Sequence, residues 1–253
     1  MLQTRVIPCL QLIEDSLVKT EKFTKHKYIG DPINTVRIFN ELEVDELCFL
    51  DIRATVERRD PSYNILKEIA NECFMPLGYG GGIDTLQKAE TVFKIGFEKL
   101  VLNSAPFNDL RLVSDIANIY GNQAVVIAVD VRKNIWGKYE VYSNSGKLNR
   151  KKSPNEWIKM VQDAGAGEIL LTSIDREGTW KGLDNELIKE VTKNTVLPVI
   201  ANGGANSIED IGVAVKNSKA SAVALGSMVV YQGKGLGVLV NFPDQEKLKQ
   251  IIK

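Results

Sequence analysis

Eight short runs rich in Val, Ile and Leu recur along the 253 residues, and each is separated from the next by a segment long enough for a helix. The runs cover residues 5–12, 46–52, 75–79, 99–103, 124–130, 168–174, 198–201 and 222–226. Strands that alternate with helices pair in parallel, and runs that are apolar almost throughout, such as 124–129, are typical of strands covered on both faces. Eight such units predict a single (β/α)₈ barrel domain over residues 1–253.

The segments between these runs carry helix signals. Asp31 followed by Pro32 places a capping carboxylate before a residue favoured in the first helical turn. Asp84 or Thr85 can cap a second helix, and Gly96 is placed to end it. Both segments are therefore predicted to be helical.

A weak internal repeat divides the chain into halves. Residues 76–83 resemble residues 198–205, and residues 99–104 resemble residues 222–227. Two half-barrels explain this repeat, and it would put equivalent loops on opposite sides of one barrel mouth.

The composition, 44% hydrophobic and 25% charged with a formal net charge of zero, is typical of a soluble globular protein and gives no sign of a basic nucleic-acid surface. No segment reaches the roughly 20 apolar residues that span a bilayer, and no secretory signal is evident at the start. We expect a cytoplasmic protein that binds neither nucleic acid nor membranes. Cys9, Cys48 and Cys73 have no paired spacing, and His26 is the sole histidine, so neither a metal site nor a cofactor is expected.

Glycines and small polar residues follow four of the predicted strands. They are Gly80–Gly82, Asn103 with Ser104, Gly203 with Gly204, and Gly226 with Ser227. Glycines let the backbone approach an anion closely, and the helix that follows adds free N–H groups. Any one pair could simply make a tight turn. Four of them around one rim favour two phosphate-binding sites.

Carboxylates also stand at strand ends, where barrel enzymes place their active sites. Asp130 ends a uniformly apolar run and is the strongest candidate for acid–base work, because restricted solvation raises the pKa of a carboxyl group. Asp51, Asp175 and Glu177 are further candidates, although Asp51 and Asp175 could equally be loop or cap residues. Lys19 lies in the long first loop, where it could fold over an anionic substrate or be solvated.

Four charged residues, Arg5, Glu46, Lys99 and Glu168, begin predicted strands and alternate in sign. They could form a salt-bridged ring at the N-terminal face of the barrel. Their spacing does not distinguish a plug that closes the barrel from a gate.

Together these residues resemble the cyclase subunit of imidazole glycerol phosphate synthase, the ammonia-using barrel of histidine biosynthesis. The resemblance runs nearly end to end. Its most specific stretches are residues 5–10, 30–32, 45–51, 80–83, 103–105, 128–130, 139–142 and 165–179.

The resemblance implies a division of labour at the barrel mouth. Gly82, Asn103 and Ser104 would hold one substrate phosphate. The other would be held by Gly178, Gly204, Gly226 and Ser227. Lys19 falls where the mobile first loop of the family contacts substrate, and Asp51, Thr172, Asp175, Glu177 and Asn202 complete the expected substrate-binding set.

The resemblance also assigns the opposite face. Arg5, Glu46, Lys99 and Glu168 would gate an ammonia passage along the barrel axis, with a glutaminase docked there to form a heterodimer. Glu98 would contribute to that docking surface, at a position where the family usually has an aspartate.

One departure from the family bears on the reaction. The family uses two catalytic aspartates, at the ends of the first and fifth strands; Asp130 is present here, but the other position holds Gln11. An amide does not take up or release a proton near neutral pH, so the glutamine in place of aspartate would lower the reaction rate about 10²–10⁴-fold. Thr20 and Asn202 also differ from the usual glycine and serine.

Gln11, residues 30–40 and the segment 232–243 resemble paralogues associated with acetamidino modification of bacterial surface sugars. Three hypotheses follow. The first is an active cyclase that uses a bisphosphorylated ribulosyl-aminoimidazole carboxamide and ammonia. The second is a subunit that channels ammonia to a separate amidotransferase in surface-polysaccharide biosynthesis, and the third is a non-catalytic scaffold that activates a glutaminase.

Overall fold

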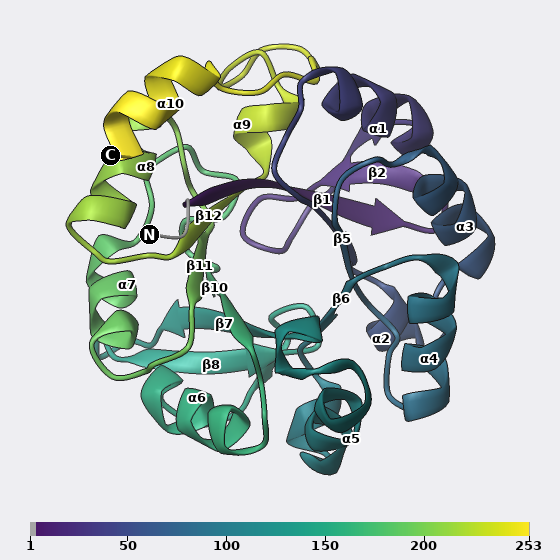
Figure 1. Ribbon diagram of the computed structural model, residues 1–253. Coiled ribbons are helices and arrows are strands. Elements are labelled where there is room, and N and C mark those ends of the chain that lie inside the picture. Colours follow the sequence, from purple (N-terminus) through teal and green to yellow (C-terminus); the bar gives the residue numbers. More distant parts are fainter. Residues whose placement is uncertain (1–3, 253) are drawn as a thin grey trace.

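The structure, a computed structural model, describes residues 4–252. Eight parallel strands close into a barrel, which Figure 1 views along its axis. Their order around the barrel is β1 (Arg5–Ile13), β4 (Leu47–Asp51), β5 (Leu77–Gly80), β6 (Lys99–Leu102), β7 (Val125–Lys133), β10 (Glu168–Ser173), β11 (Val199–Asn202) and β12 (Ala222–Leu225). Pairing of β10 with β7 and of β12 with β1 completes the closure.

Helices surround these strands as an outer ring (Figure 1). They are α1 (Pro32–Glu41), α2 (Ala54–Glu57), α3 (Tyr63–Glu72), α4 (Leu86–Ile95), α5 (Arg111–Tyr120), α6 (Pro154–Asp163), α7 (Asn185–Thr192), α8 (Ile208–Lys216), α9 (Ser227–Val230) and α10 (Gln245–Ile252). Two 3₁₀ turns span Ala105–Phe107 and Asn122–Ala124.

The predicted barrel is confirmed, as are the eight strands and the two helix starts. The Asp31 side chain accepts a hydrogen bond from Asn34 N at the start of α1, and Thr85 does the same for Lys88 N at α4. Gly96 follows α4 with a φ of 121°. A smaller difference concerns Glu46, which directly precedes β4 rather than lying in it.

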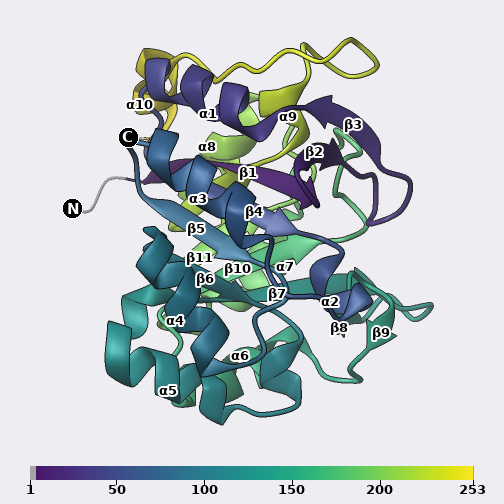
Figure 2. The same ribbon diagram turned by 90° about the vertical axis from the view of Figure 1, so that its right-hand side faces the viewer.

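Two antiparallel additions were not predicted. The first loop folds into a hairpin of β2 (Ser16–Lys19) and β3 (Lys27–Gly30), and β7 continues into an antiparallel pairing with β8 (Tyr139–Ser143), which in turn pairs with β9 (Leu148–Asn149). Figure 2 shows β2, β3, α2, β8 and β9 at the same end of the barrel. These segments build up the rim to which the carboxyl ends of the strands point.

The apolar residues form two cores. The larger lies between strands and helices and contains residues such as Phe39, Phe49 and Trp157. The smaller lies inside the barrel, where alternate strand residues point inward, and includes Ile7, Cys9, Cys48, Val101, Val126, Ala128, Leu170, Ile200, Ala222 and Ala224. Most of these inner side chains are small, which leaves room for cavities along the axis.

Candidate active site

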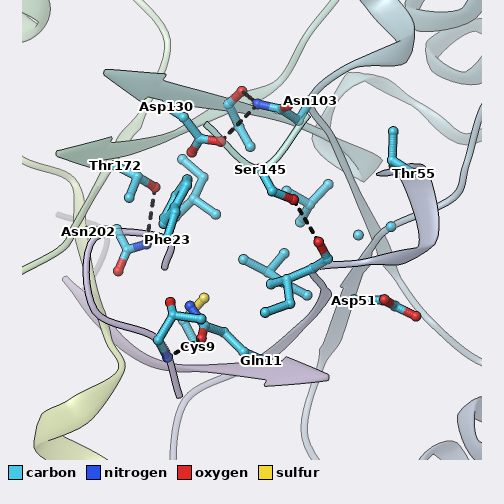
Figure 3. A pocket seen from close by; sticks show the side chains of 18 of the residues that line it. Cys9, Gln11, Phe23, Asp51, Thr55, Asn103, Asp130, Ser145, Thr172 and Asn202 are labelled. Carbon is cyan, nitrogen blue, oxygen red and sulfur yellow. Dashed lines mark hydrogen bonds between the residues drawn. The ribbon is translucent and has the colours of Figure 1, made fainter. Parts of the chain in front are cut away.

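A pocket of about 510 Å³ opens at the carboxyl ends of the strands, and Figure 3 shows side chains that line it. It brings together most of the residues that the sequence pointed to. These are Gln11, Lys19, Asp51, Gly82, Asn103, Ser104, Asp130, Thr172, Glu177, Gly178, Asn202, Gly204, Gly226 and Ser227. Asp175 is not among the residues that line it.

The strand order arranges these groups in alternating quarters of the rim. Gly82, Asn103 and Ser104, here called the first cradle, follow β5 and β6. Gly178, Gly204, Gly226 and Ser227, the second cradle, follow β10, β11 and β12. Asp130 on β7 lies between the cradles on one side and Gln11 on β1 lies between them on the other, so the two face each other across the mouth (Figure 3).

Asp130 is a buried carboxyl group, with 8% of its surface exposed. Asn103 Nδ2 donates to Asp130 Oδ2 over 3.1 Å and to the carbonyl oxygen of Ala128 over 3.0 Å, which fixes the amide between strands β6 and β7. Burial raises the pKa of Asp130 to about 7, against a smaller lowering effect of a hydrogen bond with Thr172. A carboxyl group in this state can take or give a proton near neutral pH.

Both cradles depend on glycine for conformation and for space. Gly82 has a φ of 70° and Gly204 a φ of 101°, a region that other residues rarely adopt. A Cβ on Gly204 would lie 2.5 Å from Gly182 O and 2.8 Å from Arg176 Cβ. One on Gly82 would lie 2.8 Å from Arg59 O. The two half-barrels therefore repeat the same backbone solution at opposite sides of the mouth.

The serines of the two cradles sit where chain segments meet. Ser104 Oγ donates to Asn103 Oδ1 and accepts a hydrogen bond from Asn144 N in the turn after β8, each over 3.1 Å. Ser227 is the first residue of α9, directly after Gly226. Small hydroxyl groups and free backbone N–H groups are suited to holding an anion.

Gln11, Lys19 and Glu177 form one buried cluster at the mouth. Lys19 Nζ pairs with Glu177 Oε1, and both side chains are at least nine-tenths buried. Gln11 Nε2 donates to Glu177 Oε1 over 3.4 Å, while Gln11 Oε1 accepts a hydrogen bond from Thr20 N over 2.9 Å. Burial lowers the pKa of Lys19 to about 8, against weaker raising effects of Cys9 and Glu21. The first-loop lysine is thus part of the pocket rather than a solvated residue.

Two of the candidate aspartates have other partners. Asp51 Oδ1 accepts hydrogen bonds from Arg53 N and Ala54 N at the start of α2, and Arg59 forms an ion pair with it over 2.8 Å. Figure 3 shows Asp51 pointing away from the centre of the mouth. Asp175 lies outside the pocket, where its carboxylate accepts a hydrogen bond from Lys133 N over 3.0 Å and faces Arg132.

Thr172 and Asn202 lie side by side at the ends of β10 and β11. Asn202 Nδ2 donates to Thr172 Oγ1 over 3.1 Å, and Thr172 is paired in register with Asp130. The amide at position 202 is therefore connected to Asp130 through one intervening hydroxyl group.

Sequence reasoning missed several pocket residues. Phe23, Arg58, Arg59, Ser145 and Trp180 also line the mouth. The adjacent arginines after the second barrel strand were a signal that could have been used. Phe23 and Ser145 reach the pocket through the folding of the rim hairpins, which strand periodicity does not report.

The four charges at the opposite face form the expected ring. Arg5 contacts Glu46 and Glu168, each over 2.6 Å, and Lys99 contacts the same two carboxylates over 2.9 and 3.1 Å. Glu98, exposed, precedes Lys99 on the same face. Each cation bridges both anions, so the ring closes the bottom of the barrel.

A small cavity of about 10 Å³ lies between ring and mouth. It is lined by Glu46 and Lys99 of the ring, and it shares Val101, Leu170 and Ala224 with the mouth pocket. A void of this size is near the minimum for one water molecule. The apolar side chains of Val101, Leu170 and Ala224 therefore lie between the small cavity and the mouth.

Within residues 4–252 no helix is long and apolar enough to cross a membrane, and no group of three or more His, Cys, Asp or Glu side chains is placed to hold a metal ion.

Comparison with known proteins finds related sequences along almost the whole chain. A family described as "Histidine biosynthesis protein" matches residues 5–235. A Pseudomonas aeruginosa protein with the provisional name imidazole glycerol phosphate synthase subunit hisF2 is 50% identical over 98% of this chain and 99% of its own length. A Leptospira interrogans protein, provisionally named as subunit HisF, is 42% identical over 97% of each chain. A Chlorobium phaeobacteroides protein named imidazole glycerol phosphate synthase subunit HisF is 43% identical over 83% of this chain and 84% of its own. The chain therefore belongs to the histidine biosynthesis protein family, among its HisF-type members.

Proposed function

We propose that this protein is the cyclase-type subunit of an imidazole glycerol phosphate synthase. It would use ammonia to act on a bisphosphorylated ribulosyl-aminoimidazole carboxamide, and it would release imidazole glycerol phosphate and the aminoimidazole ribotide. The observation that carries the proposal is the position of Asp130, with its pKa near 7, between two glycine-built cradles that face each other across one mouth. Two anion sites on opposite sides of an acid–base group match a substrate with a phosphate at each end.

In this proposal the mouth orients the substrate and moves protons. The two cradles hold the terminal phosphates. Asp130, positioned by Asn103, holds or accepts a proton at its carboxyl oxygens while the imidazole ring of the product forms. Lys19 and Glu177 close the first loop over the pocket and exclude water from it.

Ammonia would reach this site along the barrel axis from a glutaminase bound at the face that carries Glu98. The charged ring, the small cavity and the mouth pocket follow one another along that axis and share lining residues. Because each carboxylate of the ring is held by two cations, one ion pair could open while the other persists, which is what a gate requires.

A specific observation favours a second candidate function. Gln11 occupies the end of β1, and both ends of its amide are engaged by Thr20 and Glu177. A mouth with an amide in place of the family's second catalytic aspartate suits a barrel that delivers ammonia to a separate amidotransferase, such as one that forms acetamidino sugars of surface polysaccharides. A third candidate, a scaffold that only activates a glutaminase, is disfavoured by the two intact cradles.

The test compares ammonia-dependent turnover of the bisphosphate substrate by the purified protein and by its Gln11→Asp variant. Turnover by the unmodified protein at about 1 s⁻¹ or above would support the cyclase. Turnover that appears only in Gln11→Asp, with a gain of about 10²–10⁴-fold, would favour ammonia delivery. Absence of turnover in both proteins, with phosphate binding intact, would refute the cyclase proposal.

A further inference from the structure

The amide of Gln11 is buried between two segments that are far apart in sequence. Its exposed fraction is 8%. Its oxygen accepts the N–H of Thr20 in the first loop, and its nitrogen donates to Glu177 after β10. Gln11 therefore uses both halves of its amide, one as an acceptor and one as a donor.

Glu177 also binds the first loop, through several hydrogen bonds. The residue is buried, with 4% of its surface exposed. Its carboxylate accepts hydrogen bonds from Lys19 Nζ, from Thr20 Oγ1 over 3.2 Å and from Phe23 N over 3.5 Å. The carbonyl oxygen of Glu177 accepts a further hydrogen bond from Lys22 N over 3.0 Å. The loop is thus held by the side chain and the backbone of the same residue.

Close packing supports these contacts. A Cβ on Gly178 would lie 2.5 Å from the carbonyl oxygen of Thr20, and a Cβ on Gly226 would lie 2.9 Å from Lys19 Cε. The end of the Lys19 side chain therefore lies beside Gly226 of the second cradle. A larger residue at position 178 would overlap the backbone of Thr20, and one at position 226 would displace the end of the Lys19 side chain.

Charge explains why an amide stands at position 11. A carboxylate there could still accept the Thr20 N–H, but it could not donate to Glu177. Two buried carboxylates within hydrogen-bond distance repel each other, and Lys19 supplies a single positive charge to offset them. One carboxylate and one amide is therefore the combination that satisfies this cluster.

We propose that Gln11 and Glu177 are a matched pair of positioning residues that latch the first loop over the mouth and hold the Lys19 ammonium inside it, across from Asp130. This inference rests on the proposed function for its purpose, but the latch itself is testable without turnover. The lowered pKa of Lys19, about 8, agrees with an ammonium group that burial keeps from water.

The test uses the full chain and two probes of the loop. Amide hydrogen exchange is measured over residues 16–30, and the rate at which acetic anhydride modifies Lys19 is measured by mass spectrometry. The variants are Gln11→Glu, which keeps the length of the side chain and adds a charge, Glu177→Gln, and the swap Gln11→Glu with Glu177→Gln. Gln87→Glu, the same exchange at an exposed position of α4, is the control.

We expect Gln11→Glu to raise both rates about tenfold or more. The substitution removes the hydrogen bond to Glu177 and adds repulsion between two carboxylates, a change in free energy of about one hydrogen bond or more. Glu177→Gln should also raise the rate of Lys19 modification, because it removes the carboxylate that pairs with the ammonium group. This variant adds no buried charge, so it still tests the latch if Gln11→Glu fails to fold. The swap restores one carboxylate and one amide, so both rates should return toward those of the unmodified protein. Rates in β6, residues 99–102, report whether the barrel itself is intact.

Unchanged rates in Glu177→Gln, or a swap that is no better protected than Gln11→Glu alone, would overturn the latch. Turnover is measured separately on the same proteins. A protein that is latched but shows no turnover would refute the proposed cyclase while leaving the latch supported, so the two failures are distinguishable.

Discussion

At the scale of single residues, Asp130 shows how the barrel prepares an acid–base group. Its side chain lies at the end of a strand whose neighbours are apolar, so little water solvates the ionised form, and burial raises its pKa to about 7. Since its folded-state pKa exceeds the unfolded value, folding favours the protonated form. Its contribution to stability is full below about pH 4 and is lost as the pH rises through about 7.

Asp130→Asn removes this dependence, because the amide stays neutral at every pH. We expect the variant to be more stable than the unmodified protein by up to about 4 kcal/mol at pH 8 and to lose most of that advantage near pH 4. Urea unfolding at the two pH values measures the difference. Equal stability at pH 8 would show that Asp130 is better solvated in solution than its buried position indicates.

At the scale of elements, the strand-to-helix turns combine a strained backbone with close packing. Gly204 and Gly137 both have positive φ, 101° and 76°, but only Gly204 has neighbours where a Cβ would stand. Gly137 is at the tip of the turn between β7 and β8, with open space around it. The two positions separate conformational strain from steric conflict.

Gly204→Ala is expected to lower the free energy of unfolding by roughly 2–4 kcal/mol, because strain and overlap with Gly182 O and Arg176 Cβ add together. Gly137→Ala should cost about 1 kcal/mol, from strain alone. Thermal unfolding with and without inorganic phosphate measures both stability and anion binding. Phosphate should raise the unfolding midpoint of Gly137→Ala more than that of Gly204→Ala, in which only the first cradle still binds the anion; an equal shift in both would argue against the second cradle.

At the scale of the whole molecule, closure of the barrel brings strand starts that are distant in sequence into one ring. Glu168 and Arg5 meet across a separation of 163 residues, and Lys99 and Glu46 complete the four contacts. Helix α10 closes the outer layer in a similar way: Gln245 Nε2 donates to the carbonyl oxygens of Leu42 and Glu43 after α1. The first and last units are thus joined in both layers, by the pairing of β1 with β12 in the barrel and by this contact in the outer ring.

Lys99→Met should lower the free energy of unfolding by about 1–3 kcal/mol, because two carboxylates that are largely buried then share a single cation. Lys94→Met provides the comparison. Lys94 is exposed and its ion pair with Glu90 is long, 3.8 Å, so its loss should change the free energy of unfolding by less than about 0.5 kcal/mol. Urea unfolding at low and high salt is the measurement. Equal effects of the two substitutions would mean that the ring adds nothing to barrel closure.

Much of this architecture follows from local sequence. Apolar runs of strand length, capping residues such as Asp31 and Thr85, and glycines after the strands act over a few residues, so their consequences can be predicted without knowing the fold. Barrel closure then dictates that residues at strand starts share one face and residues at strand ends share the other. For this reason the charged ring and the two cradles could also be anticipated.

The tertiary structure alone decided which side chains contact one another at the mouth. Gln11 and Glu177 are 166 positions apart, and their contact depends on the fold of the first loop, whose hairpin no periodic pattern announced. Sequence position left Asp51 and Asp175 open as either site residues or cap and loop residues, and the fold shows that one caps α2 and the other faces the β7–β8 hairpin. Sequence position determines which end of the barrel a side chain reaches. The direction in which it points, and its partner there, are set by packing between segments that meet only in the folded chain.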